Sequence, residues 1–146
     1  MNRQTSAMFA VILGVVSAPA LGQASQGDLS KLQGTWMAAQ AEQDGKPADD
    51  VVGHRLIFED RRFEIQSVNG QRLYAGTVRL DPGTKPAAID FELTEGSSKG
   101  KVWKGIYSLE GGTLTTCDNA PNLDAARPRA FEAKSGSGYV LIRFRR

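Results

Sequence analysis

The chain has 146 residues, with 18 Lys and Arg against 16 Asp and Glu, a formal net charge of +2 and a single cysteine. One cysteine excludes an intrachain disulfide, so packing alone has to stabilise the fold. Acidic and basic residues are interspersed and form no basic stripe with interleaved aromatic residues, which argues against nucleic-acid binding.

The first 24 residues have the pattern of a secretory signal peptide. Arg3 precedes an apolar run over residues 8–16, and small residues follow that run. We expect cleavage after Ala24, with Ala20 as the second choice. The apolar run is shorter than the roughly 20 residues of a membrane-spanning helix. The sequence therefore predicts an exported protein, periplasmic or secreted, with no stable membrane insertion after cleavage and one mature domain over residues 25–146.

Downstream of this segment, apolar and polar residues alternate with period 2, and turn signals separate the alternating stretches. A short helical turn is expected first, over residues 27–34, with Asp28 as its cap and Gly34 at its end. Asn69-Gly70 is the strongest hairpin signal in the chain. We expect strands over residues 35–41, 55–59, 62–67, 71–80, 88–94, 101–109, 113–117, 130–133 and 139–145.

These segments amount to eight or nine antiparallel strands, each with one apolar face. A single open sheet of that size would leave two edges unpaired, and closing the sheet removes both edges. The fold class is therefore all-β, an antiparallel up-and-down barrel of eight or nine strands with a short N-terminal helical turn. A two-sheet sandwich is the alternative.

The stretch Gly34-Thr35-Trp36, placed between the helical turn and the first strand, resembles the signature of the lipocalin superfamily. The resemblance implies that Trp36 plugs the closed end of a barrel and that an arginine from the last strand lies against its ring. Arg143 and Arg145 are the candidate arginines. Gly34, Trp36 and these arginines would then hold the barrel end together.

A closer resemblance covers nearly the whole mature chain. The segments LQGTW, IDFELTEGSSKGK, GIYSLEGGTLTTC, RPRAF and KSGSG are together similar to an uncharacterised lipocalin-like domain family abundant in planctomycete bacteria. Gly112 stands where that family usually has Asp, in a turn. The resemblance implies a lipocalin-like, usually exported barrel, and it brings no activity, ligand, cofactor or catalytic residue with it.

Polar residues that could carry chemistry have simpler explanations. His54 is the only histidine, and no other residue gives it the spacing of a metal site, so we expect no metal. Cys117 has no base beside it in the sequence, and a small buried residue is the favoured interpretation. Asp90 and Glu92 alternate with apolar residues and fit the solvent face of a strand. We therefore predict no catalytic residues, no cofactor and no enzyme activity.

Six large aromatic residues are expected in the barrel interior. A barrel of about eight strands either fills with side chains or encloses one small ligand, and the sequence leaves both outcomes open. A loop over residues 118–129 is expected either to cover the open mouth, to dock a partner, or to act as a plain connection. The interior candidates are Phe58, Phe63, Tyr74, Phe91, Trp103 and Tyr107.

The favoured function is an exported non-enzymatic barrel module that binds a small apolar ligand in its interior. The alternative is a structural or protein-interaction domain of the cell envelope with a filled barrel and an unknown protein partner. A hydrolase or isomerase that works at the barrel mouth is the least favoured of the three hypotheses, because no catalytic constellation is evident.

Overall fold

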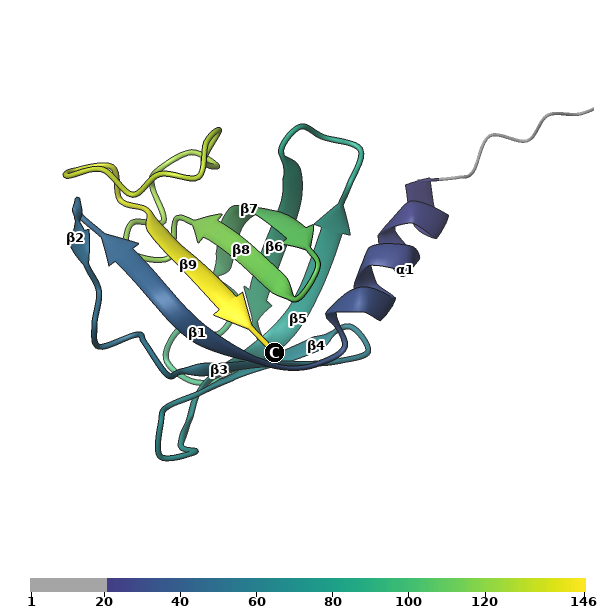
Figure 1. Cartoon of the computed structure of the whole chain (residues 1–146), viewed down its shortest axis with the longest axis horizontal. Coiled ribbons are helices and arrows are strands. Elements are labelled where there is room, and N and C mark those ends of the chain that lie inside the picture. The colour runs from purple at the N-terminus through teal and green to yellow at the C-terminus, as the bar shows by residue number, and fades with distance from the viewer. Residues whose placement is uncertain (1–20) are drawn as a thin grey trace, which may run out of the picture.

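The computed structural model describes residues 21–146, and the apolar run of the predicted signal peptide lies outside these residues. Within them the chain forms one helix followed by nine strands (Figure 1). The helix is α1 (Leu21–Leu32). The strands are β1 (Gly34–Gln43), β2 (Lys46–Pro47), β3 (Arg55–Glu59), β4 (Arg62–Gln66), β5 (Arg72–Asp81), β6 (Ala87–Leu93), β7 (Val102–Glu110), β8 (Thr113–Asp118) and β9 (Val140–Arg145).

The strands close into an antiparallel barrel. β1 and β3 to β9 pair in chain order, and β9 pairs back with β1, so that eight strands form the wall; β2 pairs only with the end of β1. At the closure Ala38 lies opposite Phe144, and the register shifts between Ala38 and Gln40. Closure gives every wall strand two neighbours, which removes the unpaired edges of an open sheet. The predicted up-and-down barrel is confirmed, and the sandwich is excluded.

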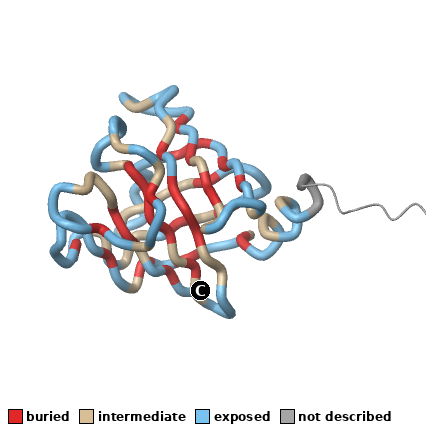
Figure 2. Tube along the Cα trace, turned by 90° about the horizontal axis from the view of Figure 1, so that it is seen from above, coloured by how far each residue is buried: buried red, intermediate tan, exposed pale blue. Residues whose placement is uncertain are grey.

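Alternation along the strands decides which side chains enter the barrel. On β6, Ile89, Phe91 and Leu93 are buried and belong to the main core, whereas Glu92 is exposed. Successive side chains of a strand point to opposite faces, so the odd-numbered residues of β6 face inward. Figure 2 shows buried residues gathered along the strands and exposed residues in the connections.

The outer face of three strands is buried as well. Ile106 of β7, Cys117 of β8 and Leu141 of β9 stand side by side across the sheet and form a second apolar cluster. Residues 119–139, which connect β8 to β9, cover them, with Phe131 and Ala133 packed against the cluster. This part of the wall is therefore buried on both faces.

Two local predictions are wrong, and one short strand was not predicted. The N-terminal helical element runs for 12 residues, so Asp28 lies inside the helix and does not cap it. Residues 130–133 form no strand, because their apolar side chains pack against the outer cluster. The two-residue strand β2 was not expected; it pairs with β1 beyond a tight turn in which Asp44 and Gly45 have positive φ.

The two ends of the barrel are built differently. α1, the C-terminus and the short β3–β4 and β7–β8 turns lie at one end, which we call the closed end (Figure 1). The longer β1–β3 and β8–β9 connections and the β4–β5 and β6–β7 turns lie at the other, which we call the open end. Antiparallel neighbours bring alternate connections to the same end, so chain order alone fixes this division.

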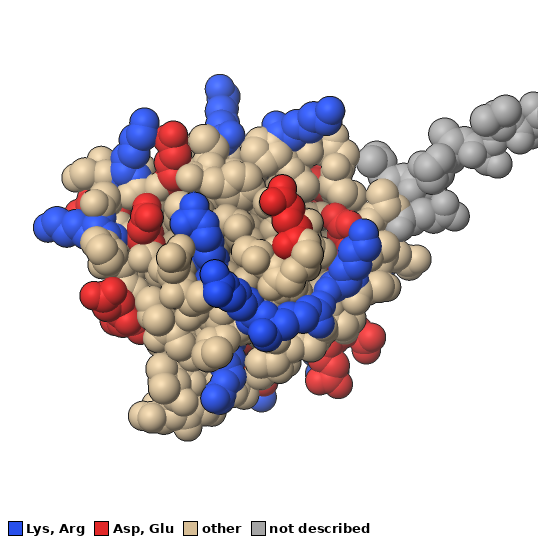
Figure 3. Space-filling view, in the orientation of Figure 1, with Lys and Arg blue, Asp and Glu red and all other residues tan. Residues whose placement is uncertain are grey.

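Charges of both signs are spread over the surface. Figure 3 shows acidic and basic side chains intermixed, with basic side chains running together over the face that carries β9 and the C-terminus. Arg143, Arg145 and Arg146 are all exposed there. The terminal basic group in the sequence is thus a local feature of one face.

Candidate functional site

The open end of the barrel contains a cavity of about 660 Å³. Three of the predicted interior aromatics line it, namely Tyr74, Phe91 and Trp103. Other apolar lining residues include Leu56, Ile65, Leu123, Val140, Ile142 and Phe144. Ligand sites in proteins are concave, mostly apolar and a few hundred Å³ in volume, and this cavity has those properties.

The other predicted interior aromatics fill the barrel towards the closed end. Phe58, Phe63 and Tyr107 are at most 3 % exposed and belong to the main core. The ring of Phe63 meets that of Phe91 edge to face, with 5.0 Å between centroids, so the filled core forms the floor of the cavity. The sequence leaves a filled and a hollow barrel as alternatives. In the structure the barrel is filled towards the closed end and hollow at the open end.

Tyr74 lies at the rim. Its side chain is 42 % exposed, and its ring meets that of Trp103 edge to face at 4.8 Å between centroids. Tyr74 is near the first residue of β5, which starts at the open end. Tyr74 is therefore on the inward face of β5, as predicted, but it lies at the rim of the barrel and not deep in the interior.

Trp36 occupies the closed end and is fully buried. Its indole N–H donates a hydrogen bond to the carbonyl of Leu32, the last residue of α1, at 2.8 Å. Gly34 lies between them with φ of +104°, a conformation that favours glycine. The helix ends at Leu32, so Gly34, which is predicted to end it, instead opens β1 two residues later.

The arginine on Trp36 is Arg146 rather than the expected Arg143 or Arg145. The guanidinium carbon of Arg146 lies 4.3 Å from the centroid of the Trp36 ring, within the range of a cation–π contact. Phe144 points into the barrel, so Arg143 and Arg145 on the same strand point outward. Ile142 and Phe144 face inward, and Arg146, one residue beyond the end of β9, is the next residue in this alternation.

Hydrogen bonds tie α1 and the turns of the closed end together. Arg146 donates to the carbonyl of Gln33 at 2.9 Å and to a carbonyl of α1. The side chain of Gln33 exchanges two hydrogen bonds with the backbone of Asp60 in the β3–β4 turn. The hydroxyl of Tyr107 donates to Asp28 at 2.5 Å, and burial, with this carboxylate, raises the pKa of Tyr107 above its usual range.

Asp118 is a buried acid in the wall of the cavity. It is the last residue of β8, it is 5 % exposed, and it lines the cavity. One carboxylate oxygen accepts a hydrogen bond from the backbone N–H of Ala120 at 2.9 Å. Among residues 21–146 the other oxygen accepts no hydrogen bond from the protein and has no basic group within ion-pair distance, but it is not a fully buried atom and can reach solvent in the cavity. Burial raises the pKa of Asp118 to about 7.

The neighbours of Asp118 leave room for its side chain. Thr116 is buried on the same face of β8 and also lines the cavity. Gly105 faces Asp118 in the β7–β8 pairing, and a Cβ at Gly105 would lie 2.8 Å from the Cβ of Asp118. A carboxyl and a hydroxyl thus stand together on one wall of an otherwise mainly apolar space.

Basic residues line the cavity at its mouth. His54 is half-buried, whereas Arg55 and Lys101 are exposed. Arg55 is the first residue of β3, His54 precedes that strand, and Lys101 ends the β6–β7 turn, whereas Asp118 ends β8. Arg55 and Lys101 are exposed at the rim, and Asp118 is buried.

Exposed apolar side chains surround this mouth. Five of the six large hydrophobic residues that are exposed among residues 21–146 lie at the open end. They are Val52, Val68, Leu73, Tyr74 and Leu123. The sixth, Met37, is the fourth residue of β1 and does not line the cavity. A grouped apolar rim of this kind marks a binding surface more often than isolated exposed residues do.

The β8–β9 connection covers the mouth only in part. Ala120 and Leu123 border the cavity. Further along, Arg127 is fixed to the outer wall, where it forms an ion pair with Asp90 at 2.7 Å and donates to the carbonyl of Gly105 at 2.8 Å. The loop expected over residues 118–129 therefore lies at the rim in its first half and against the outside of the barrel in its second half.

Cys117 and His54 lie on opposite sides of the barrel wall. Cys117 is fully buried in the outer cluster, with its thiol 3.4 Å from the carbonyl of Glu132. Burial raises the pKa of the Cys117 thiol to about 11, which opposes the reactive thiolate form. His54 lines the cavity on the inner side. The two residues cannot act as a nucleophile and base pair in this arrangement.

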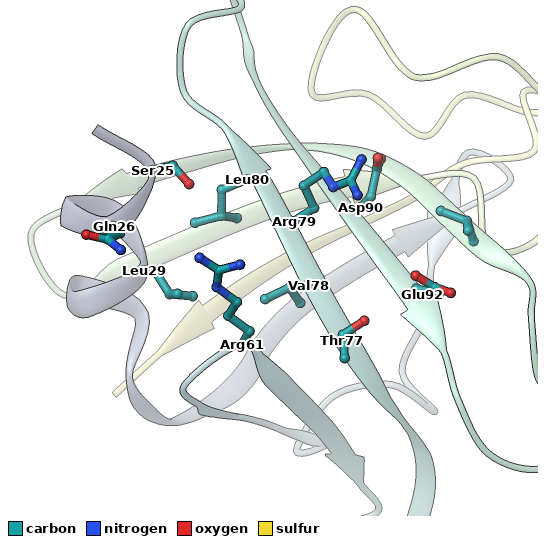
Figure 4. Close-up of a pocket in the computed structure, with 11 residues that line it drawn as sticks. Ser25, Gln26, Leu29, Arg61, Thr77, Val78, Arg79, Leu80, Asp90 and Glu92 are labelled. Carbon is teal, nitrogen blue, oxygen red and sulfur yellow. The ribbon is translucent and has the colours of Figure 1, made fainter. Parts of the chain in front are cut away.

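A smaller groove of about 370 Å³ lies between α1 and β5 (Figure 4). Leu29 of α1 lies at its edge, and Arg61, Arg79, Asp90 and Glu92 contribute its charged side chains. Opposite charges are balanced in this groove, and Asp90 is already paired with Arg127. The open-end cavity is the larger and more apolar of the two.

Comparison of the chain with protein-family models, with curated proteins and with solved structures gives no match. The lipocalin-like resemblance therefore stays a prediction. Residues 21–146 include no helix that is both long enough and apolar enough to cross a membrane. Over the same residues, no group of three His, Cys, Asp or Glu side chains is placed to hold a metal ion.

Sequence reasoning missed two residues of the barrel ends, Asp118 and Arg146. Both follow the inward alternation of their strands: Asp118 after Leu114 and Thr116, and Arg146 after Phe144. The signal was present, but each residue is polar and stands at or just beyond a strand end. A polar residue in that position is normally assigned to the following loop.

Proposed function

We propose that the chain is an exported, non-enzymatic barrel that binds a small apolar ligand in its open-end cavity. The observation that carries the proposal is a cavity of about 660 Å³ with aromatic and aliphatic walls, above a filled and capped closed end. A fold needs no such space for its own stability, because protein interiors otherwise pack densely.

The apolar rim supports the same proposal. Leu73 and Leu123 are partly exposed at the mouth and also line the cavity. An apolar ligand that leaves a membrane, an aggregate or another protein would meet a continuous apolar path from the rim inwards. Burial of such a ligand would be stabilised by roughly 25 cal/mol for each Å² of apolar surface removed from water.

A binding module is favoured over an enzyme by the placement of the reactive side chains. Cys117 points to the outer cluster, and His54 points to the cavity. Cys117 and His54 therefore do not meet as a nucleophile and base pair at the mouth.

Export is proposed from the signal-peptide pattern, and α1 bears on the cleavage position. In the described part of the chain α1 comprises Leu21–Leu32, so cleavage after Ala24 would remove residues 21–24 of this helix, whereas cleavage after Ala20 would keep them. The intact mass of the chain recovered from an exporting bacterial host distinguishes the two positions. Recovery of the uncleaved chain from the cytoplasm alone would contradict the export proposal.

Ligand binding is tested with the neutral fluorescent probe N-phenyl-1-naphthylamine. We expect saturable fluorescence enhancement at about one probe per barrel. Ile142→Trp should abolish it, because Ile142 lines the cavity and the larger ring would fill it. Arg143→Trp is the matched control, since Arg143 is the next residue and points outward.

Equal probe binding by the two variants, or none by the unmodified chain, would contradict the proposal. That result would favour the alternative, a structural or protein-interaction domain of the cell envelope. The exposed rim would then be its contact surface, and cross-linking in cells through a residue near Val68 should trap a protein partner.

A further inference from the structure

The cavity has one feature that an apolar ligand alone does not explain. Asp118 is buried in its wall without a cationic partner among residues 21–146. A buried carboxylate without a partner destabilises a fold, because its charge loses solvation and gains no compensating interaction. The barrel closes without this carboxyl group, because the strand pairing of β8 uses only the backbone.

We propose that Asp118 is the polar anchor of the ligand, and that the ligand is an apolar molecule with a terminal ammonium group. This inference rests on the proposed binding of a ligand in the open-end cavity. An ammonium group seated against Asp118 would supply the missing opposite charge and would donate to the carboxylate oxygen that no protein group contacts. Thr116 stands beside it with a hydroxyl that can accept a second N–H.

The surroundings of Asp118 favour a cation over an anion at that depth. Trp103 and Tyr74 line the same space, and aromatic rings attract cations to their faces. The basic residues Arg55 and Lys101 are exposed at the rim, where water weakens their pull on an anion. A carboxylate ligand would have to approach a buried acid, whereas an ammonium ligand would neutralise it.

The proton balance of the site is a consequence that can be measured. Because burial raises the pKa of empty Asp118 to about 7, part of the carboxyl population is protonated at neutral pH. A bound ammonium group favours the ionised form, so binding at pH 7 should release a fraction of a proton from Asp118. The other ionisable groups that line the cavity are Asp50, His54, Arg55 and Lys101.

Three ligands with the same ten-carbon tail test the inference on the purified full chain. They are decylamine, 1-decanol and decanoate, titrated by calorimetry at pH 8 with intrinsic tryptophan fluorescence in parallel. We expect decylamine to bind about 10- to 100-fold more tightly than 1-decanol, as a charge-assisted hydrogen bond implies, and decanoate to bind most weakly. Asp118→Asn should bring decylamine and 1-decanol to similar affinities and leave that of 1-decanol unchanged.

Asp50→Asn is the matched control, because Asp50 is an exposed acid that lines the same mouth. It should change the decylamine affinity less than about twofold, as expected for a solvated charge. Calorimetry at pH 7 in buffers of different ionisation enthalpy should show proton release with decylamine and none with 1-decanol. His54→Asn should retain most of this release. This measurement needs no Asp118 variant, so it stays decisive even if Asp118→Asn folds poorly.

The outcomes separate this inference from the proposed function. Equal affinities for decylamine and 1-decanol, a preference for decanoate, or an amine preference that survives in Asp118→Asn would overturn the inference and leave a ligand-binding cavity. A preference for decanoate would place the anchor at Arg55 and Lys101. Failure of all three ligands to bind would overturn the proposed function itself.

Discussion

The closed and open ends of this barrel treat their polar groups in opposite ways. At the closed end the indole of Trp36, the guanidinium of Arg146 and the hydroxyl of Tyr107 all have hydrogen-bond partners, those of Arg146 and Tyr107 from distant parts of the chain. At the open end Asp118 is as buried as many core residues but has only one backbone N–H for a partner. Apolar side chains differ in the same way, because they are packed in the core at the closed end and partly exposed at the open end.

This difference indicates that the packed, capped part of the barrel and the part that keeps open space are separated along the barrel axis. A capped end can be rigid because every strand of the wall already has two neighbours there, and α1 closes it. The other end keeps space and an unpaired acid, and both reduce the stability of the folded state. Substitutions at the closed end should therefore lower stability, whereas suitable substitutions at the open end should raise it.

The largest expected effect is at the closed end. Trp36→Ala should lower the free energy of unfolding by about 3–5 kcal/mol, because it removes a large, fully buried side chain and leaves a cavity. Urea denaturation followed by circular dichroism measures this change. Met37→Ala is the control, since Met37 is the next residue and is 51 % exposed. Similar losses in both variants would show that Trp36 does not hold the closed end.

At the open end, substitution of Asp118 should increase the free energy of unfolding, and the size of this increase should depend on pH. Because the pKa of Asp118 is raised to about 7 in the folded state, the folded chain binds this proton more tightly than the unfolded chain. The stability that Asp118 contributes is thus present at low pH and is lost as the pH rises from about 4 to about 7. Asp118→Asn removes the group that titrates.

We therefore expect Asp118→Asn to become more stable than the unmodified chain as the pH rises, by up to about 4 kcal/mol at pH 8 relative to pH 4. Urea unfolding of both proteins across this range gives the difference directly. Asp50→Asn should show no such trend, because its carboxyl group is exposed. Parallel stability curves for Asp118→Asn and the unmodified chain would mean that Asp118 is ionised without penalty in the folded state.

A smaller effect tests which arginine caps Trp36. Arg146→Ala should cost about 1–2 kcal/mol, because it removes a cation–π contact and hydrogen bonds to backbone carbonyls near the surface. Arg145→Ala should change stability by less than about 0.5 kcal/mol, because Arg145 is exposed on the outer face. Thermal unfolding of the two variants settles the comparison, and equal shifts would argue against a special role for Arg146.

The sequence was sufficient for the barrel but not for its ends. Alternation on β6, the Asn69-Gly70 turn and the Gly34–Trp36 stretch all act over a few residues, and the structure follows them. The outer cluster of Ile106, Cys117 and Leu141 was not predicted, because its partners come from the 119–139 connection. Whether a segment without period 2 covers a wall or a mouth depends on contacts that the local sequence pattern does not encode.

The candidate site was predicted in its apolar part only. Aromatic residues at inward positions of the strands predict a barrel interior. How deep each one lies depends on its distance from the end of the barrel. For this reason Tyr74 lies at the rim, whereas Phe63 lies in the core. Asp118 could be recognised as inward-facing only once β8 was known to extend to it. Strand limits are the least certain part of any sequence-based assignment, and functional groups stand at those limits here.

The smallest expected effect concerns the attachment of α1 to the barrel. Tyr107→Phe removes the hydroxyl that donates to Asp28 and leaves the ring in the core, so the loss should be about 1 kcal/mol. The amides of α1 should exchange with solvent faster, while those of β6 and β7 keep their protection, because the bond fixes the helix and not the wall. Hydrogen exchange with mass spectrometry resolves the two regions. Equal acceleration in both would mean that α1 and the barrel unfold together, and the closed end would then be one cooperative unit with the wall above it.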